Sequence, residues 1–440
     1  MDKTRKEAFL ILNNILNKDA FLNEELIRLK NINKRDYNFI VNLVRGVLEN
    51  KLLIDNLIRN YSKIRIKKIH PAILIILELC IYQMFFMDKI PAYSAINESV
   101  DLAKEFGNRG SVGFTNGILR NILRNSQEII SSDYNLDIIK SRDYSDYLSK
   151  KYSHPKFFVD YLLKDHDKNF VEDLLISNNK KAPFFIRVNN LKVDLNEFIK
   201  SAENKGYKLR PTKLSEKVLE VLNPEGIFDT DLFKRGYFYV QDLASVLVAE
   251  LSDIGGGSKI LDLCASPGGK SFNFSMLYPD SKIISCDISK KKVNLIEENK
   301  KRLGIRNIDI KINDASRLKK EFIGNFDFVL VDAPCSGLGL YRRKVEIRYN
   351  TDMSDVESLK IIQKKILTNA LKYLNSHGNL TYSTCTLTKE ENEEVVREVL
   401  NENKDFEIER TCGEEFKRFY PNIDNTDGFT MCRLKRKIWK

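Results

Sequence analysis

The chain after residue 236 alternates short apolar runs with longer amphipathic stretches, and this alternation limits the possible folds more than any other feature. Strands are predicted at 259–263, 282–287, 308–312, 326–332 and 379–383. Helices are predicted at 270–277, 290–303, 355–374 and 389–401. Nearly continuous apolar strands that alternate with helices form a parallel sheet covered on both faces. Residues 236–440 therefore predict an α/β, Rossmann-like domain, with 428–434 as one arm of a terminal antiparallel hairpin.

The first 128 residues predict a separate, all-α domain. Apolar residues recur at helical spacing throughout, as expected for a compact helical bundle. The most apolar stretch, 71–87, contains Glu78 and Gln83, which favours a buried helix over a membrane span. After this bundle, residues 129–160 are polar and predict a linker. Residues 161–235 mix a helix with short strands and predict a small α+β subdomain.

The charge balance favours an acidic partner. The formal net charge is +11, and nucleic acid is the commonest acidic partner, although a lysine-rich solvated surface has the same composition. Seven cysteines without a Cys-x-x-Cys pair argue against a disulfide framework and a thiolate zinc site. The histidines show no metal spacing, so no metal is expected. Reduced thiols fit the cytoplasm, and we expect a cytoplasmic monomer that does not bind membranes.

A Gly-rich turn, within Asp262–Lys270, lies between the first predicted strand and the next helix. This order places free backbone N–H groups beside a ligand, and Gly268 and Gly269 allow close approach. Asp287 ends the next strand, where a carboxylate can bind ribose hydroxyls, and Asp314 ends the third, on the adenine side. The turn has neither the dinucleotide nor the phosphate-loop glycine spacing. The pattern therefore favours an S-adenosylmethionine site.

Two cysteines follow predicted strands, at the sheet edge that faces the ligand in open α/β folds. Cys335 lies three residues after Asp332, and Cys385 lies within Thr381–Thr386. Position C5 of cytosine is too weakly nucleophilic to take a methyl group directly, but a thiolate added at C6 activates it. The reaction also needs a hydrogen bond at N3 and a base that removes the C5 proton. The carboxyl and the two thiols meet these needs, and together they predict covalent methyl transfer to a pyrimidine.

Each of these residues also has a purely structural interpretation. A cysteine is often a small buried hydrophobe, and Asp332 could cap a helix. The small, polar, turn-forming neighbours of Cys335 and Cys385 favour the chemical role. The remaining cysteines have no supporting motif of this kind and are interpreted as structural: Cys80, Cys264, Cys286, Cys412 and Cys432.

Three basic segments are candidates for RNA contact. Residues 342–344 follow the Asp332 loop closely, so we expect a role near bound RNA. Segments 63–68 and 435–437 could bind phosphate or form solvated faces.

Four ordered motifs resemble those of the RNA cytosine-C5 methyltransferases of the Sun or Nop2 family. These motifs are 262–270, 332–337, 381–386 and 427–429, with further landmarks at 187–189 and 240–242. The N-terminal region resembles the antitermination factor NusB at 45–48, 96–100 and 114–120. A NusB-like domain joined to this catalytic domain is similar to the bacterial enzymes that methylate cytosine C5 in 16S rRNA.

The resemblance implies a role for each matching residue. Cys385 is the nucleophile that adds to C6, Cys335 assists release as the base in the elimination, and Asp332 holds cytosine at N3 and borders the cofactor. S-adenosylmethionine binding is implied for Cys264, Ala265, Ser266, Pro267, Gly268, Gly269, Lys270, Asp287 and Asp314. The implied partner is 16S rRNA.

Two alternatives stay open. The same chemistry could act on tRNA, or the chain could be a non-catalytic module that binds RNA or a transcription factor. The intact set of Asp332, Cys335 and Cys385 argues against the second.

Overall fold

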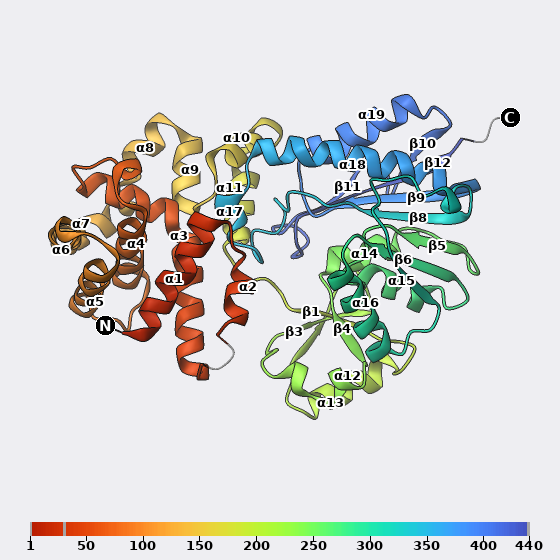
Figure 1. Cartoon of the computed structure of the whole chain (residues 1–440), viewed down its shortest axis with the longest axis horizontal. Coiled ribbons are helices and arrows are strands. Elements are labelled where there is room, and N and C mark those ends of the chain that lie inside the picture. The colour runs from red at the N-terminus through yellow and green to blue at the C-terminus, as the bar shows by residue number, and fades with distance from the viewer. Residues whose placement is uncertain (1, 30–31, 438–440) are drawn as a thin grey trace. The chain divides into compact units, whose positions relative to one another are not determined.

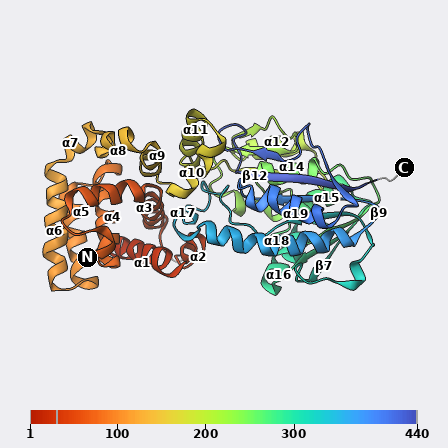
Figure 2. The same cartoon turned by 90° about the horizontal axis from the view of Figure 1, so that it is seen from above.

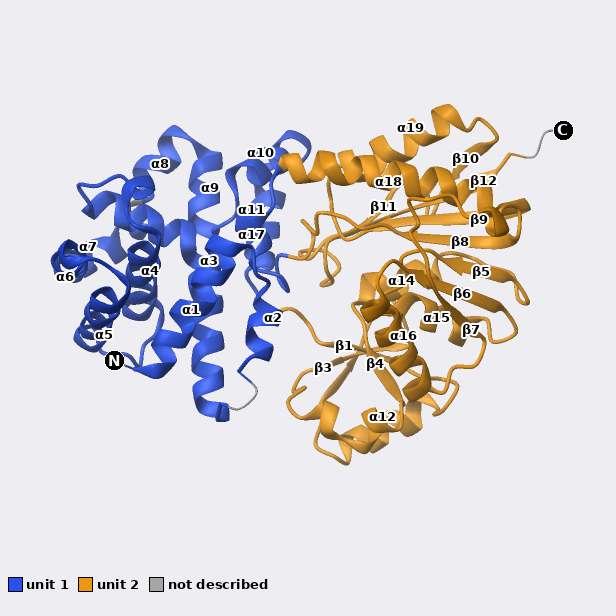
Figure 3. Ribbon diagram, viewed as in Figure 1, with its two compact units in different colours: residues 1–180, 341–352 blue, residues 181–340, 353–440 orange. Residues whose placement is uncertain are grey.

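The structure is a computed structural model that describes residues 2–29 and 32–437. It divides into two compact units (Figures 1 and 3). The helical unit comprises the chain up to Lys180 together with Tyr341–Asp352, and the catalytic unit comprises Lys181–Leu340 and the chain from Met353 onward.

The helical unit packs around one apolar core that includes buried side chains of α1, α3, α4, α5 and α6. Its helices are α1 (Lys3–Lys18), α2 (Leu22–Ile27), α3 (Lys34–Tyr61), η1 (Ile66–Lys68), α4 (Pro71–Phe86), α5 (Ala92–Phe106), α6 (Arg109–Arg124), α7 (Ser126–Ser131), η2 (Asp133–Asn135), α8 (Asp137–Arg142), α9 (Tyr144–Tyr152), α10 (Lys156–Asp165), α11 (Lys168–Asn178) and α17 (Ile347–Asn350). The apolar segment predicted as a buried helix is α4, which begins with Pro71 in its first turn. Among the described residues, no helix combines the length and hydropathy that a membrane span requires.

Local polar residues fix where several of these helices begin. The Asp2 side chain accepts hydrogen bonds from the N–H groups of Thr4 and Arg5 at the start of α1. Asn108 and Ser111 exchange side-chain and backbone hydrogen bonds at the start of α6. The segment 129–160, for which the sequence suggested a linker, contains α8, α9 and the start of α10, with Tyr147 and Leu148 buried. The few apolar residues of this segment lie among many polar ones, so its overall composition does not reveal its helices.

The catalytic unit begins with a small antiparallel sheet of order β2-β3-β1-β4. Its elements are β1 (Phe185–Val188), α12 (Leu195–Glu203), β2 (Leu209–Pro211), β3 (Val218–Val221), η3 (Ile227–Asp229), α13 (Asp231–Lys234) and β4 (Phe238–Val240). Phe198 of α12 packs edge-on against Phe238 of β4 in a core of its own. The sequence predicted an α+β subdomain at 161–235. The observed sheet runs from Phe185 to Val240, and α11, which lies within the predicted range, belongs to the helical unit.

The second sheet of this unit has the order β10-β12-β9-β8-β5-β6-β7, and β11 pairs with β12. Its elements are α14 (Leu243–Glu250), β5 (Lys259–Asp262), α15 (Gly269–Leu277), β6 (Lys282–Asp287), α16 (Lys290–Leu303), β7 (Ile308–Ile312), η4 (Lys320–Phe322), β8 (Phe326–Asp332), α18 (Met353–Tyr373), β9 (Leu374–Thr384), η5 (Glu390–Glu394), α19 (Val395–Glu402), β10 (Phe406–Glu409), β11 (Lys417–Phe419) and β12 (Phe429–Arg436). The strands from β9 to β7 are parallel, and β10, β11 and β12 are antiparallel. The predicted Rossmann-like fold is confirmed.

Helices cover both faces of this sheet, as Figures 1 and 2 show. Buried side chains of α14, α15 and α16 pack on one face, and those of α18 and α19 pack on the other. The strands of such a sheet are apolar on both sides because neither face meets water. The parallel register places Asp332 of β8 opposite Ser383 of β9, so both strands end at the same edge, close to the end of β5.

Candidate active site

A cavity of about 350 Å³ opens at the carboxyl edge of the parallel sheet. The turn after β5 supplies one wall, and Asp332 and Cys385 come from the ends of β8 and β9. Gln241 and Phe429 contribute from the segments next to β4 and β12. The topology thus brings together segments that lie almost two hundred residues apart in the sequence.

The turn after β5 needs both of its glycines. Gly268 precedes α15 with a φ of +105°, and a Cβ there would lie 2.3 Å from the ring of Phe272. A Cβ on Gly269 would lie 2.9 Å from Nε2 of Gln241. The backbone of this turn therefore packs more closely than any side chain would allow.

The predicted cofactor residues divide into two groups. Cavity-lining residues are Cys264, Ala265, Ser266, Pro267, Gly269, Lys270 and Asp332. Gly268, Asp287 and Asp314 are not among the residues that line it. Asp287 is buried and accepts a hydrogen bond from the Ser266 N–H at 3.1 Å, so it supports the turn. Asp314 accepts hydrogen bonds from the side chain and backbone N–H of Ser316, and the side-chain bond is the main cause that lowers the pKa of Asp314.

Oδ1 of Asp262 and Oε1 of Gln241 are buried at this cavity and have no hydrogen-bond partner among the described residues. The other oxygen of Asp262 accepts a hydrogen bond from Ser271 Oγ at 2.6 Å, and burial raises the pKa of Asp262 to about 7. An unpaired buried acceptor is costly, so both oxygens fit a ligand with N–H donors. The α-ammonium group of S-adenosylmethionine carries such donors.

The sequence did not predict either residue as part of the cofactor site. Asp262 lies inside the recognised motif and Gln241 inside a family landmark, but neither was assigned to the cofactor. The alternation pattern places Asp262 at the end of a strand, a position that could have indicated its role. Only the three-dimensional packing of Gln241 against Gly269 brings it to the cavity.

Lys270 and Asp332 form an ion pair at the centre of the site. Lys270 Nζ lies 2.7 Å from Asp332 Oδ2, and Ser383 Oγ donates to Asp332 Oδ1 at 2.8 Å. The ammonium also lies 5.1 Å from the centroid of the Phe429 ring. The side chain of Asp332 remains 28% exposed, so its carboxylate is both held in place and accessible. It ends a strand and does not cap a helix.

The two predicted cysteines lie in contact. Their Sγ atoms are 2.7 Å apart, both thiols are free, and the Cys385 N–H donates to the sulfur of Cys335 at 3.2 Å. The hydrogen bond with Cys385, followed by burial, raises the pKa of Cys335 well above the ordinary value of a thiol. Cys335 is therefore held as a neutral thiol that can donate to the other sulfur. Cys385 lines the cavity, whereas Cys335 is not among its lining residues.

The other cysteines lie apart from this pair. Cys80, Cys286 and Cys432 are buried, and Cys412 is exposed in a turn with positive φ. Burial raises the pKa of Cys264 well above its usual range, so this thiol forms a neutral part of the cavity wall. Within the described residues, no cluster of acidic, histidine or cysteine side chains could hold a metal ion.

One residue that was predicted to lie near RNA is buried inside the helical unit. Arg342 is buried, and its Nε donates to the Ser177 carbonyl at 3.0 Å within the helical unit. Lys344 of the same segment is exposed. The sequence predicted a role near bound RNA for this segment, and nothing local in it indicates that the arginine folds inward.

The fold and the cavity define a methyltransferase with a Rossmann-like sheet. The Gly-rich turn after the first parallel strand and the carboxylate of Asp332 line the same cavity, an arrangement typical of nucleoside sites in such sheets. Unpaired acceptors beside that turn suit the amino-acid end of the cofactor.

Comparison with known proteins gives the particular family. The model of the 16S rRNA methyltransferase RsmB/F matches residues 251–435, the NusB family matches 2–124, and an RsmF/B-like ferredoxin-like domain matches 154–227. The chain is 31% identical over 428 residues to the probable ribosomal RNA small subunit methyltransferase B of Bacillus subtilis (strain 168), covering 94% of each chain. The chain belongs to the RsmB/F family of 16S rRNA methyltransferases. The resemblance found in the motifs and in the NusB-like region is confirmed.

Solved structures share the fold. The crystal structure of PH0851 covers 99% of this chain and 100% of its own, with a TM-score of 0.79 and 21% identity. NSun6 from Pyrococcus horikoshii was solved with SFG, an analogue of S-adenosylmethionine. It covers 63% of this chain and 97% of its own, with a TM-score of 0.57 and 23% identity. The chain is an rRNA methyltransferase, and its cofactor is S-adenosylmethionine.

Proposed function

We propose that this enzyme methylates C5 of a cytosine in 16S rRNA through a transient bond between Cys385 and C6 of the base. The observation that carries the proposal is the contact between Cys385 and Cys335 at the edge of the cofactor cavity. Methylation of an exocyclic amine needs no thiol. A pair of thiols beside Asp332 suits attack on the ring itself.

The chain's own residues supply the steps of addition and release. The thiolate of Cys385 adds to C6, and the electron pair moves to C5, which becomes an enamine-like nucleophile. S-adenosylmethionine, when bound, supplies the methyl group that C5 takes. The proton on C5 must then leave as the bond between Cys385 and C6 breaks, which restores the aromatic ring and the thiolate.

Cys335 is placed to act in the second half of this sequence. While Cys385 is a thiolate, the neutral thiol of Cys335 can stabilise it by donating a hydrogen bond. Once the sulfur of Cys385 is bonded to carbon, it no longer carries that charge. Cys335 can then release its proton to water and take the C5 proton as a general base.

Asp332 and Lys270 hold the base. The carboxylate can accept a hydrogen bond from a protonated N3 or from the exocyclic amine of cytosine, and the ammonium keeps that carboxylate charged and oriented. Protonation at N3 favours addition at C6 because it withdraws electrons from the ring. A base that is stacked in RNA cannot enter this cavity and meet both thiols, so the target nucleotide must leave its stack. A single chain supplies every group named here, which supports a monomer, and the proposed rRNA substrate supports a cytoplasmic location.

Separate replacement of the two cysteines tests the proposal. Cys385→Ala should abolish methylation and any denaturant-stable RNA adduct, whereas Cys335→Ala should let that adduct accumulate. If the two outcomes were exchanged, the roles would be reversed. If the wild-type enzyme and both variants gave no adduct, covalent chemistry would be excluded.

Sequencing of bisulfite-treated RNA from a deletion strain tests the substrate. Loss of one methylated cytosine in 16S rRNA is expected. Loss at a tRNA position alone would contradict the rRNA assignment.

A further inference from the structure

A π-turn, η5 (Glu390–Glu394), lies between β9 and α19, and it faces the two cysteine loops. Its residues Glu391 and Asn392 are consecutive and almost fully buried, at 0% and 1% exposure. The sequence predicted one continuous helix over this segment. A π-turn is an uncommon interruption of a helix and is frequent at functional sites.

Glu391 holds the loop that carries Cys335. Its Oε1 accepts hydrogen bonds from the Ser336 N–H at 2.8 Å and from Gln363 Nε2 at 3.0 Å. Its Oε2 accepts from Ser336 Oγ at 2.5 Å and from Thr388 Oγ1 at 2.9 Å. Ser336 follows Cys335 directly, so this carboxylate fixes the backbone next to the thiol.

Asn392 holds the turn that carries Cys385. Its Oδ1 accepts a hydrogen bond from Thr384 Oγ1 at 2.8 Å. Its Nδ2 donates to the carbonyl of Thr388 at 2.7 Å and, at 3.4 Å, to that of Thr386. Thr384 and Thr386 flank Cys385 on either side, so one amide spans the nucleophile's turn.

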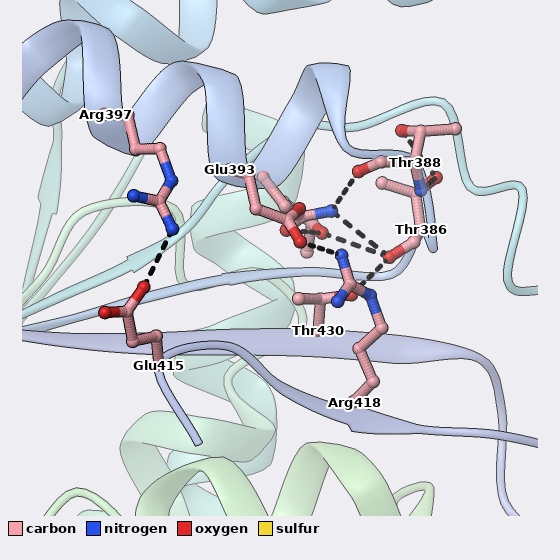
Figure 4. A network of polar contacts seen from close by, with 9 residues as sticks. Thr386, Thr388, Glu393, Arg397, Glu415, Arg418 and Thr430 are labelled. Carbon is pink, nitrogen blue, oxygen red and sulfur yellow. Dashed lines mark hydrogen bonds and ion pairs between the residues drawn. The ribbon is translucent and has the colours of Figure 1, made fainter. Parts of the chain in front are cut away.

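Further contacts lie beside this arrangement. Thr430 Oγ1 of β12 donates to the Thr386 carbonyl at 2.8 Å (Figure 4). Glu393 forms an ion pair with Arg418 of β11. Figure 4 shows Glu393 on the helix beside Arg418, and Thr430 beside the loop that contains Thr386. Among the described residues, Glu393 forms no hydrogen bond with either cysteine loop, so it offers a matched control.

We propose that Glu391 and Asn392 are positioning residues that set the two thiols relative to each other, each acting on a different step. Glu391 positions Cys335 through Ser336 and therefore affects release of the methylated base. Asn392 positions Cys385 through its turn and therefore affects formation of the adduct. This inference rests on the covalent mechanism proposed above.

The reason for two separate effects is geometric. A buried acceptor that loses one of its donors leaves a polar group unpaired, and the segment around it shifts. A displacement of about 1 Å can slow a reaction about 100-fold. Loss of the Glu391 contacts moves Cys335, the general base, but leaves the nucleophile Cys385 in place. Loss of the Asn392 contacts moves Cys385 and leaves Cys335 in place.

Single-turnover kinetics on a 16S rRNA fragment, with adduct and product resolved on a denaturing gel, tests this division. In Glu391→Gln the new amide cannot accept from the Ser336 N–H and the three other donors together. Adduct should form at the wild-type rate, and release should slow about tenfold or more. In Asn392→Asp the acceptor for Thr384 remains and both donated bonds are lost, so adduct formation should slow while no adduct accumulates.

Glu393→Gln should change neither step, and cofactor binding by calorimetry should be unchanged in all three variants. If Glu391→Gln fails to fold, Gln363→Leu carries the test, because it removes one donor from the same carboxylate and one bond to the Pro334 carbonyl next to Cys335. Equal slowing of both steps, or no adduct accumulation in either Glu391→Gln or Gln363→Leu, would overturn the positioning role. A wild-type enzyme that forms no adduct would overturn the covalent mechanism itself, which separates the two failures.

Discussion

The molecule contains two buried lysine–carboxylate clusters, one in each unit, and they differ in access. In the helical unit, Lys51 Nζ lies 2.6 Å from Glu78 Oε1 and 2.9 Å from Asp55 Oδ2, and the Glu78 side chain is completely buried. In the catalytic unit, Lys270 pairs with Asp332, which keeps 28% of its side chain exposed. The carboxylate beside Lys51 is fully buried, whereas the carboxylate beside Lys270 is partly exposed at the strand ends.

Cavity size does not separate these two regions. The cavity beside Lys51 has a volume of about 640 Å³, against about 350 Å³ for the catalytic cavity. The larger cavity is lined by both acidic and basic side chains and has no cysteine among its lining residues. The smaller cavity combines a glycine turn, unpaired acceptors and a thiol. Chemistry at the strand ends, and not volume, identifies the active site.

The largest effect should come from Lys51→Met in the helical unit. Lys51 donates to both Asp55 and the buried Glu78, so its removal leaves both groups without their partner, and the free energy of unfolding should fall by about 3–5 kcal/mol. Urea denaturation measures this change. The folded fraction should keep its cofactor affinity, and an unchanged unfolding free energy would show that this cluster is not structural.

Lys270→Met should lower activity and leave stability nearly unchanged, the opposite of Lys51→Met. Asp332 can stay hydrated through its exposed part, so stability should change little. Its carboxylate would lose orientation, and kcat/KM on an rRNA fragment should fall about 100-fold, equivalent to about 2.7 kcal/mol. A loss of stability as large as that of Lys51→Met would remove the contrast between the two clusters.

The pH dependence of stability should sharpen the contrast. Burial raises the pKa of Glu78 from 4.5 to about 8, even with Lys51 beside it. The folded protein therefore holds this proton more tightly than the unfolded chain. Its contribution to stability is complete below pH 4.5 and is lost as the pH rises through about 8. Glu78→Gln should remove this decline, which is at most about 1.4 kcal/mol per pH unit. Urea midpoints between pH 5 and 8 measure it, and an unaltered slope would contradict the assignment.

The smallest change in free energy is expected for cofactor binding by Gln241→Met. Loss of the unpaired Oε1 removes one acceptor for the cofactor's ammonium group, so the Kd of S-adenosylmethionine should rise about fivefold, or about 1 kcal/mol. Calorimetry measures it. Tighter binding by the variant would show that this oxygen does not face the cofactor.

The sequence predicted those parts of the site that local pattern controls. The strand that ends at Asp332, the glycine turn and the cysteine at 385 each follow from alternation and turn chemistry. Parallel pairing then brings strand ends to one edge, so contact between the thiols follows from topology. The site roles themselves stay predictions.

Long-range packing decides the features that sequence reasoning did not give. Strand β9 begins at Leu374, five residues before the predicted start, because pairing with β8 extends it past the apolar run. The π-turn around Glu391 interrupts a segment with ordinary helical composition, since its buried polar residues meet partners from other loops. Arg342 turns inward for the same reason. Periodicity describes one element at a time and does not contain these partners.

The most direct test replaces the target cytosine of an rRNA fragment with 5-fluorocytosine. Fluorine occupies the position of the C5 proton, so the elimination step cannot occur and the adduct persists. Mass spectrometry of the digested complex should find the nucleotide attached to the peptide that contains Cys385. Attachment to Cys335, or a methylated product without any adduct, would contradict the account.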